Sequence, residues 1–326
     1  MSAADHERRL ILKVSQLFYR SGLSHTEIAS RLRLSRFQVA RLLRTALDDG
    51  YVTVKILEPD RWHSGLERQL EERFGLRAAI VVDSEDISDG EARLRAADAA
   101  GRYLGEVLAD GDVLGISLGR TVQSVVDQLP DRIDRRVEVV QLIGGSSRVA
   151  TELNSMILTA DLARRFRCAP HLLFAPAAVA AGSVRRALLE DTEIKETFSL
   201  FGQLTIALLG IGSLSQGETS RLLYGGLIDD ESRTGLLAQG AVGDVLSYVY
   251  DQSGAILNSA AGDRMIAISP DQLLAVPHRI AVATGKAKAT AIAGALAGGL
   301  VNVLITDSQA AGAICSDLPR DSGPAR

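Results

Sequence analysis

Short apolar runs alternate with helical patterns through most of this chain, and this alternation restricts the possible folds more than any other feature. Runs of aliphatic residues at 78–82, 112–117 and 204–209 indicate buried strands, and helical periodicity follows them. Such alternation predicts an α/β, Rossmann-like fold, in which helices cover both faces of a parallel sheet. We expect further strands at 137–143, 171–174, 265–268, 279–283 and 301–305, and helices at 91–108, 120–129, 152–166, 184–190, 232–238, 270–275 and 286–297.

The composition fits an α/β protein and argues against several other classes. The 326 residues suggest two domains, and aromatic residues make up 4% of them. Cys168 and Cys315 lie far apart without a CxxC motif, so we expect two reduced thiols. The five histidines are scattered, so neither a metal site nor another cofactor is expected. The apolar segments are short or interrupted by glycine and the N-terminus is charged, which predicts a cytoplasmic protein without a membrane span.

Residues 22–50 have the pattern of a helix-turn-helix. Ser24 and Glu27 match a capping box before a short helix at 26–32. A second N-cap, Ser35, precedes a longer helix that runs to about Leu47. An apolar stripe at 10–18 supplies a third helix, and the alternation at 51–57 predicts the strand of a wing. Arg33 lies in the turn, where a positive φ would cost about 1 kcal/mol.

The outward face of the second helix has the chemistry of a major-groove reader. Arginine and glutamine can read base edges, and arginine also neutralises phosphates. Residues 1–57 carry ten basic and five acidic side chains, whereas the whole chain has a net charge of −4. A basic module on an acidic body is typical of a DNA reader with a partner domain; an ordinary helix pair with a solvated charged face is the alternative. The expected contacts to double-stranded operator DNA are Thr26, Ser35, Arg36, Gln38, Arg41 and Arg44.

Polar and glycine-rich turns follow several strands of the expected sheet, at the edge where such folds bind ligands. The sharpest turn begins where a strand ends at Ser117. Gly119 allows close backbone approach, and Arg120 with Thr121 opens the next helix. Free N–H groups at a helix start suit a phosphate. A tight strand-to-helix turn without a ligand has the same spacing and remains the alternative.

Two further turns carry charged side chains that suit a sugar phosphate. In Gly-Ala-Val-Gly-Asp at 240–244, Asp244 follows a glycine turn, where it could bond sugar hydroxyls or merely cap the next helix. Lys286 and Lys288 stand at the start of a helix, where the helix dipole disfavours cations. An anionic ligand would explain that placement, and a solvated lysine is the alternative.

These motifs, in this order, resemble the SorC family of bacterial sugar-responsive transcriptional regulators, also grouped with DeoR-type regulators. The resemblance covers about residues 10–314. Its marks lie at 22–36, at 66–76, in Gly-Ile-Ser-Leu-Gly-Arg-Thr at 115–121, in Val-Gln-Leu-Ile-Gly-Gly at 140–145, at 240–244 and in Asn-Val-Leu-Ile-Thr-Asp at 302–307.

The resemblance implies an effector domain akin to ribose-5-phosphate isomerase and glucosamine-6-phosphate deaminase, but used for binding. Ser117, Gly119, Arg120 and Thr121 would match the phosphate cradle, and the surrounding pocket would comprise Gly145, Asn154, Gly212, Asp244 and Lys288. Some relatives form a Schiff base through a lysine where this chain has Ile143, which implies non-covalent binding. Leu118 stands where the family usually has tryptophan. Family members are commonly homodimers or homotetramers, which fits a palindromic operator.

The sequence therefore predicts a non-enzymatic transcriptional regulator controlled by a sugar or sugar phosphate. We expect a DNA-binding domain at 1–57, a hinge at 58–64, an effector and oligomerisation domain at 65–316 and a flexible tail at 317–326. An isomerase or deaminase-like enzyme that carries a DNA module is the first alternative, because such chemistry needs only a base such as Asp244 beside a phosphate cradle. A scaffold whose body only oligomerises is the second.

Overall fold

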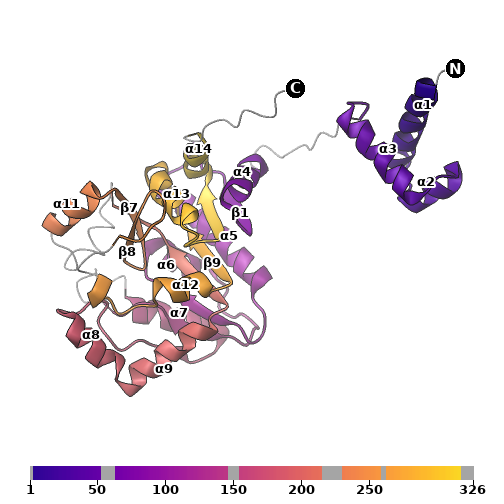
Figure 1. The fold of residues 1–326 in the computed structure, drawn as a ribbon. Helices are drawn as coiled ribbons and strands as arrows, with labels where there is room; N and C mark the ends of the chain where they lie inside the picture. Colours follow the sequence, from indigo (N-terminus) through magenta and orange to yellow (C-terminus); the bar gives the residue numbers. More distant parts are fainter. Residues whose placement is uncertain (1–2, 53–62, 146–153, 215–229, 258–261, 317–326) are drawn as a thin grey trace. The chain divides into compact units, whose positions relative to one another are not determined.

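The computed structural model describes residues 3–52, 63–145, 154–214, 230–257 and 262–316 (Figure 1). The chain forms two compact units, Met1–Glu58 and Pro59–Arg326. Most of the predicted wing and hinge, and the predicted tail, lie outside the described residues. In the ranges that are described, no helix is both long and apolar enough to cross a membrane.

The smaller unit is a helix-turn-helix built on three helices. Its elements are α1 (Ala3–Ser15), the π-helical turn η1 (Gln16–Arg20), α2 (His25–Leu32) and α3 (Arg36–Asp48). Ser24 and Ser35 are the N-caps of α2 and α3, and each closes a capping box, with Glu27 and Gln38 respectively. Arg33 ends α2 with a φ of 54°, so the predicted positive φ is confirmed.

The three helices enclose a small core whose residues recur at helical spacing. Val39, Leu42 and Leu43 of α3 are buried against Ile11 and Val14 of α1 and the rest of this core. Ala29 of α2 is buried in the same cluster, as expected for a small residue where two helices cross closely. The packing leaves the opposite side of α3 to solvent.

A seven-stranded parallel sheet is the centre of the larger unit. Its order is β1-β10-β9-β5-β2-β3-β4, and every pairing is parallel. The strands are β1 (Ala78–Val82), β2 (Val113–Ile116), β3 (Glu138–Gln141), β4 (Pro170–His171), β5 (Ile206–Gly210), β9 (His278–Val282) and β10 (Val303–Asp307).

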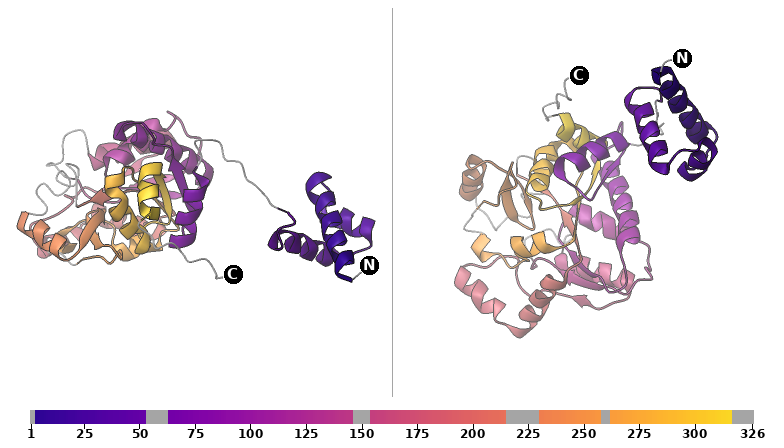
Figure 2. Two further views of the ribbon diagram at one scale, coloured as in Figure 1. Left: turned by 90° about the horizontal axis from the view of Figure 1, so that it is seen from above. Right: turned by 45° about the vertical axis from the view of Figure 1, so that its right-hand side comes forward.

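Helices cover both faces of this sheet and produce two core layers (Figures 1 and 2). Along β5, Ile206 and Leu208 face the layer of α5, α6 and α7, whereas Ala207 and Leu209 face that of α4, α13 and α14. This alternation follows from the two-residue period of a strand. The helices and helical turns are α4 (Ser64–Phe74), α5 (Asp89–Val107), α6 (Arg120–Gln128), α7 (Ser155–Phe166), α8 (Gly182–Leu189), α9 (Thr192–Leu200), η2 (Phe201–Gln203), α11 (Asp230–Ala238), η3 (Gly262–Arg264), α12 (Pro270–Ala275), η4 (Lys286–Lys288), α13 (Ala289–Ala297) and α14 (Ser308–Ser316).

A second, antiparallel sheet was not expected from the sequence. It consists of β6 (Gly212–Ser213), β7 (Ala241–Val245) and β8 (Tyr248–Asp251) in that order. Gly240 does take a turn conformation, with a φ of 87°. Asp244, however, lies within strand β7 rather than in a turn and caps no helix, so its predicted place in a turn was wrong.

Two other differences concern the segments beyond β4 and α11. Residues 265–268, predicted as a strand, form isolated bridges from Met265 to Ala178 and from Ala267 to Ile143. Helix α9 was not predicted; its N-cap Asp191 accepts hydrogen bonds from the backbone N–H groups of Glu193 and Ile194. That capping carboxylate begins a new helix where the preceding one ends.

Candidate functional site

The parallel sheet changes its direction of winding between β2 and β5. From β2 the chain moves outward to β3 and β4, and from β5 it moves the other way, to β9 and β10. The loops that follow the carboxyl ends of β2 and β5 therefore run in opposite directions. Open α/β sheets bind ligands at such a switch point.

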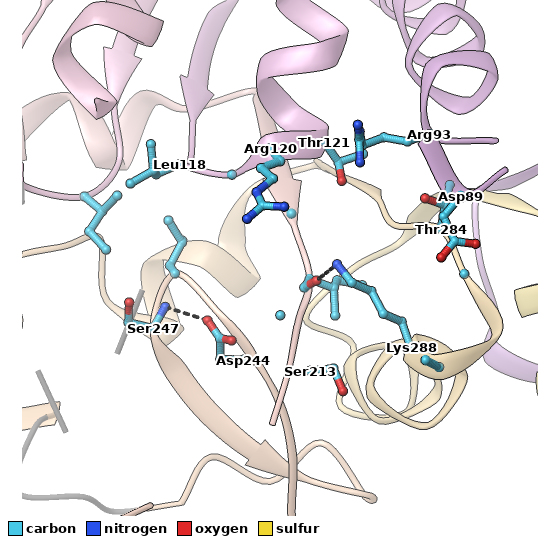
Figure 3. A pocket seen from close by; sticks show the side chains of 18 residues that line it. Asp89, Arg93, Leu118, Arg120, Thr121, Ser213, Asp244, Ser247, Thr284 and Lys288 are labelled. Atoms are coloured by element: carbon cyan, nitrogen blue, oxygen red, sulfur yellow. Dashed lines mark hydrogen bonds between the residues drawn. The ribbon is translucent and has the colours of Figure 1, made fainter. Parts of the chain in front are cut away.

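A cavity of about 380 Å³ lies at this switch point (Figure 3). Its volume is within the usual range for small-ligand sites. Arg120, Lys288 and Asp244 approach it from α6, η4 and β7 respectively. The lining residues are Asp89, Arg93, Leu118, Gly119, Arg120, Thr121, Ile143, Gly210, Ile211, Gly212, Ser213, Asp244, Leu246, Ser247, Thr284, Gly285, Ala287 and Lys288.

The start of α6 forms the cradle side of this cavity. Gly119 is the N-cap and provides no side-chain cap, so the first N–H groups of α6 lack the usual side-chain acceptor. Its φ of 165° is extended backbone that any residue adopts, and an added Cβ would lie 3.8 Å from Val122 Cγ2. Gly119 therefore leaves the start of α6 without a side chain above it. The backbone conformation alone does not require glycine at this position.

Three of the predicted pocket residues lie outside the lining. The buried Ser117 hydroxyl accepts a hydrogen bond from the Gly210 N–H at 3.2 Å and ties the end of β2 to β5. Gly145 donates its N–H to the Ala175 carbonyl oxygen at 2.8 Å and is not among the lining residues. Asn154 is the exposed N-cap of α7 and accepts from Met156 N at 2.9 Å. Gly119, Arg120, Thr121, Gly212, Asp244 and Lys288 do line the cavity.

Lys288 is a partly buried cation in the wall of the cavity. Its ammonium donates a hydrogen bond to the Ile211 carbonyl oxygen at 2.9 Å, and that bond is drawn in Figure 3. Burial lowers the pKa of Lys288, and Arg93 and Arg120 lower it further, while the Asp244 carboxylate partly opposes these effects. The folded protein therefore holds this charge at an electrostatic cost that a bound anion would reduce.

Asp244 is a buried carboxylate, 3% exposed, and the local backbone holds it in place. Its Oδ2 accepts a hydrogen bond from the Ser247 N–H at 3.3 Å. Gly212 pairs with Asp244 across β6 and β7, and a Cβ on Gly212 would lie 1.9 Å from Asp244 Oδ1. The glycine therefore provides the space that the carboxylate occupies.

The hairpin that joins β7 to β8 borders the cavity with unusual backbone geometry. Its two turn residues, Leu246 and Ser247, have φ values of 53° and 66°. Two-residue hairpins favour such left-handed pairs because their twist matches that of the strands. Residues other than Gly, Asn and Asp are uncommon at these positions. The strain lies next to Asp244 in the wall of the cavity, and such strain is often found at functional sites.

Arg93 and Asp89 are lining residues that the sequence reasoning missed. Both come from the first turns of α5, which begins at the N-cap Ser88. The Arg93 Nε is buried and has no hydrogen-bond partner among the described residues. The sequence offered little signal, because Arg93 is one of several arginines on an ordinary charged helix.

Two positions at which this chain differs from the SorC family pattern both lie at the cavity. Ile143 and Leu118 are lining residues, and Ile143 is 5% exposed. An isoleucine side chain forms no Schiff base, and a leucine offers no aromatic face for stacking. In the described part of the chain, no group of three or more His, Cys, Asp or Glu side chains could hold a metal ion.

The predicted DNA-contacting residues are all solvent-exposed in the smaller unit. Arg36, Arg41 and Arg44 are exposed on α3. Ser35 and Gln38 also serve the capping box, since Gln38 Oε1 accepts the Ser35 N–H at 2.8 Å. Thr26 is exposed in the first turn of α2.

A helix-turn-helix joined to a ligand-binding α/β unit defines the class of ligand-responsive DNA-binding regulators. The family model described as "Putative sugar-binding domain" matches residues 62–316. This chain therefore belongs to that family of sugar-binding domain proteins.

Several relatives match nearly the whole chain, two of them at more than 30% identity. It is 31% identical to the sorbitol operon regulator of Klebsiella pneumoniae, over 93% of this chain and 96% of the relative. It is 32% identical to the deoxyribonucleoside regulator of Bacillus subtilis, over 96% and 100%. The full-length crystal structure of the Klebsiella pneumoniae regulator SorC superposes with a TM-score of 0.73, covering 93% of this chain and 97% of that one. The chain is thus a member of the SorC-type family of sugar-responsive transcriptional regulators, and the expected family and regulatory function are confirmed.

Proposed function

We propose that this protein regulates a carbohydrate-catabolism operon and that its effector is an anionic sugar bound in the switch-point cavity. The observation that carries the proposal is the excess of cationic side chains there. Arg93, Arg120 and Lys288 line one cavity together with Asp244 and Asp89. A sugar phosphate supplies the missing negative charge, and its hydroxyls suit the Asp244 carboxylate.

The backbone supports an anionic group in the same place. The start of α6 lines the cavity and has no side-chain cap. Helix N-termini bind phosphates through free N–H groups and the helix dipole. Gly285 has a φ of 98°, which favours glycine, and its N–H donates to the Asp307 carboxylate. Asp307 thus holds the loop that carries Lys288.

The names of the relatives support a carbohydrate ligand. One regulates a sorbitol operon and another is a deoxyribonucleoside regulator. In the same proposal, α3 reads double-stranded operator DNA through Arg36, Gln38, Arg41 and Arg44, with Thr26 and Ser35 at the helix starts. We propose a homodimer or homotetramer on a palindromic operator, acting in the cytoplasm, where bacterial DNA lies.

A thermal-shift comparison of matched sugars and sugar phosphates tests the charge of the effector. A ligand at 100 times its Kd stabilises the protein by about 2.7 kcal/mol. A phosphorylated sugar should raise Tm, and its unphosphorylated partner should raise it much less. Arg120→Ala should remove the shift. Arg164→Ala, an exposed helix arginine outside the cavity lining, should keep it. Equal shifts from both members of each pair would contradict an anionic effector.

The relatives are named as regulators, which favours a protein that binds its ligand without turnover. A separate experiment tests the enzyme alternative. We propose that the effector is bound and released without any chemical change to the effector itself. Incubation with ribose 5-phosphate and amino-sugar phosphates, followed by NMR, should show no product. Turnover that disappears in Asp244→Asn would assign the protein to an isomerase or deaminase-like class.

A further inference from the structure

An aromatic side chain stands fully in solvent at the start of α3. Phe37 is the second residue of that helix and is 91% exposed, far more than any other large exposed hydrophobic side chain in the described ranges. Its neighbour Leu34, just before the N-cap, packs on the core of the smaller unit instead. Phe37 therefore has no packing role in this unit.

The helical period places Phe37 at the centre of the outward face of α3. The buried stripe of α3 consists of Val39, Leu42, Leu43 and Ala46. Phe37 lies on the opposite side, one turn before Arg41 and two turns before Arg44, because residues three, four and seven apart share a helix face. Both arginines are exposed. The phenyl ring thus stands in line with two cations that suit DNA phosphates or guanine.

We infer that Phe37 reads the C5-methyl group of a thymine in the major groove of the operator, an inference that rests on the proposed DNA-reading role of α3. The only apolar group that a base pair presents in the major groove is the thymine methyl, and phenylalanine is among the residues that contact it. In a helix-turn-helix, the N-terminal residues of the second helix approach the base edges. Phe37 occupies that position.

The capping box adds a second reason to assign apolar readout to this helix start. The neighbouring Gln38 uses its Oε1 to accept the Ser35 N–H at 2.8 Å. A bidentate adenine contact needs both the acceptor and the donor of a glutamine amide. With its oxygen already engaged in the capping box, Gln38 has its amide N–H donors free for a base edge. The exposed ring of Phe37 therefore adds a separate, apolar readout beside Gln38 and Arg36.

The test uses thymine-to-uracil replacement, which removes the methyl group and keeps base pairing. The probe is the duplex most enriched by the full-length protein from a random DNA library. Each thymine is replaced by uracil in turn, and binding is followed by fluorescence anisotropy. When uracil replaces the contacted thymine, wild type should bind about fourfold more weakly at one position per half-site. This is the change in affinity expected from the burial of one methyl group. Phe37→Ala should bind the thymine duplex more weakly and should be insensitive to uracil at that position.

The variants are chosen so that folding does not obscure the result. Phe37 is exposed and alanine is the better helix former, so Phe37→Ala should keep its Tm. Phe37→Leu should retain part of the sensitivity to the methyl group. Phe174→Ala, at a phenylalanine 60% exposed in the larger unit, is the matched control and should bind both duplexes like wild type.

Three results would overturn the inference. Wild-type binding that is unaffected by uracil at every position excludes a methyl contact. Phe37→Ala that keeps the full wild-type sensitivity to uracil assigns the methyl contact to another residue. A changed oligomeric mass of Phe37→Ala, with unchanged DNA affinity per assembled molecule, assigns Phe37 to a contact between copies. Failure to enrich any duplex would also contradict the proposed function, whereas the first three results leave that function intact.

Discussion

At the scale of single residues, Lys288 should make effector binding depend on pH. Burial, Arg93 and Arg120 lower the pKa of Lys288 in the folded protein. The ammonium is present below that lowered pKa and is lost above it, so affinity for an anion should fall as pH rises through it. The measurement is the Kd of the most stabilising sugar phosphate from neutral to alkaline pH. Lys288→Arg should flatten the profile, because arginine stays charged.

The same lowered pKa has an opposite consequence for the ligand-free protein. The pKa of Lys288 in the folded state lies below its unfolded value, so the charged form is penalised by folding. That penalty is present below the folded pKa and is relieved as pH rises toward the unfolded pKa. Stability from this group therefore rises over the window in which effector affinity falls. A pH profile in which both fall together would contradict the assignment.

Gly212→Ala should weaken effector binding by displacing a carboxylate. The new Cβ would lie 1.9 Å from Asp244 Oδ1, so the Asp244 side chain must rotate away from its position in the cavity wall. We expect at least a tenfold loss of affinity, about 1.4 kcal/mol, if Asp244 bonds effector hydroxyls. Gly105→Ala, where an added Cβ has open space, is the control and should bind normally. Normal binding by both variants would remove Asp244 from the site.

Some of the residues singled out from the sequence do line the cavity, and others are used elsewhere in the fold. Asp244 and Lys288 carry charges at unusual places in the sequence, and both line the cavity. Ser117 belongs to the same motif as Gly119, yet its hydroxyl is used within the sheet. Arg93 reaches the cavity only because α5 begins beside it, and no local pattern records that neighbour.

At the scale of elements, the turn of the helix-turn-helix contains removable strain. Arg33 has a φ of 54° at the end of α2, a conformation that costs a non-glycine residue about 1 kcal/mol. Arg33→Gly should therefore stabilise the smaller unit by about that amount. Arg31→Gly, in the last turn of the same helix, should destabilise it by about 1 kcal/mol. Calorimetry of the full chain measures both, and the same sign for both variants would refute the explanation.

Elements were predictable where the hydrophobic period was regular. Buried strands such as β1, β5 and β10 and the capped helix α3 follow directly from apolar runs and N-cap residues. Strand β7 was mistaken for a turn because it contains Gly243. That glycine is needed for packing, since a Cβ there would lie 2.6 Å from the Tyr250 hydroxyl and 2.8 Å from Ala291 Cβ. A packing glycine and a turn glycine look the same in a sequence.

At the scale of the whole molecule, DNA affinity should decrease steeply with salt through the arginines of α3. Each neutralised phosphate contributes about −0.9 to the slope of log K against log salt. Arg44→Ala should weaken binding to all sequences and reduce the magnitude of the slope by about 1 if it contacts a phosphate. Arg186→Ala, in α8 of the larger unit, should leave the slope unchanged. An unchanged slope for Arg44→Ala would exclude a phosphate contact.

The overall architecture was largely predictable because both halves carry strong periodic signals. Strand and helix alternation predicted the parallel sheet, and the paired N-caps predicted the helix-turn-helix. The convergence of three cations on one cavity was not fully predictable, since it depends on which strand ends are neighbours. The order β9-β5-β2 brings together loops that are more than 150 residues apart in the sequence, from Arg120 to Lys288.

We propose that a ligand in the switch-point cavity controls operator binding by the helix-turn-helix. A ligand alters DNA affinity only if it binds the DNA-competent and DNA-incompetent states differently. The direct measurement is anisotropy of the enriched duplex against increasing concentrations of the most stabilising sugar phosphate, for wild type and Lys288→Ala. Wild-type DNA affinity should change with the sugar phosphate. Lys288→Ala should bind ligand-free DNA normally and should not respond. An equal response of both proteins at the same sugar phosphate concentration would contradict control of DNA binding through this cavity.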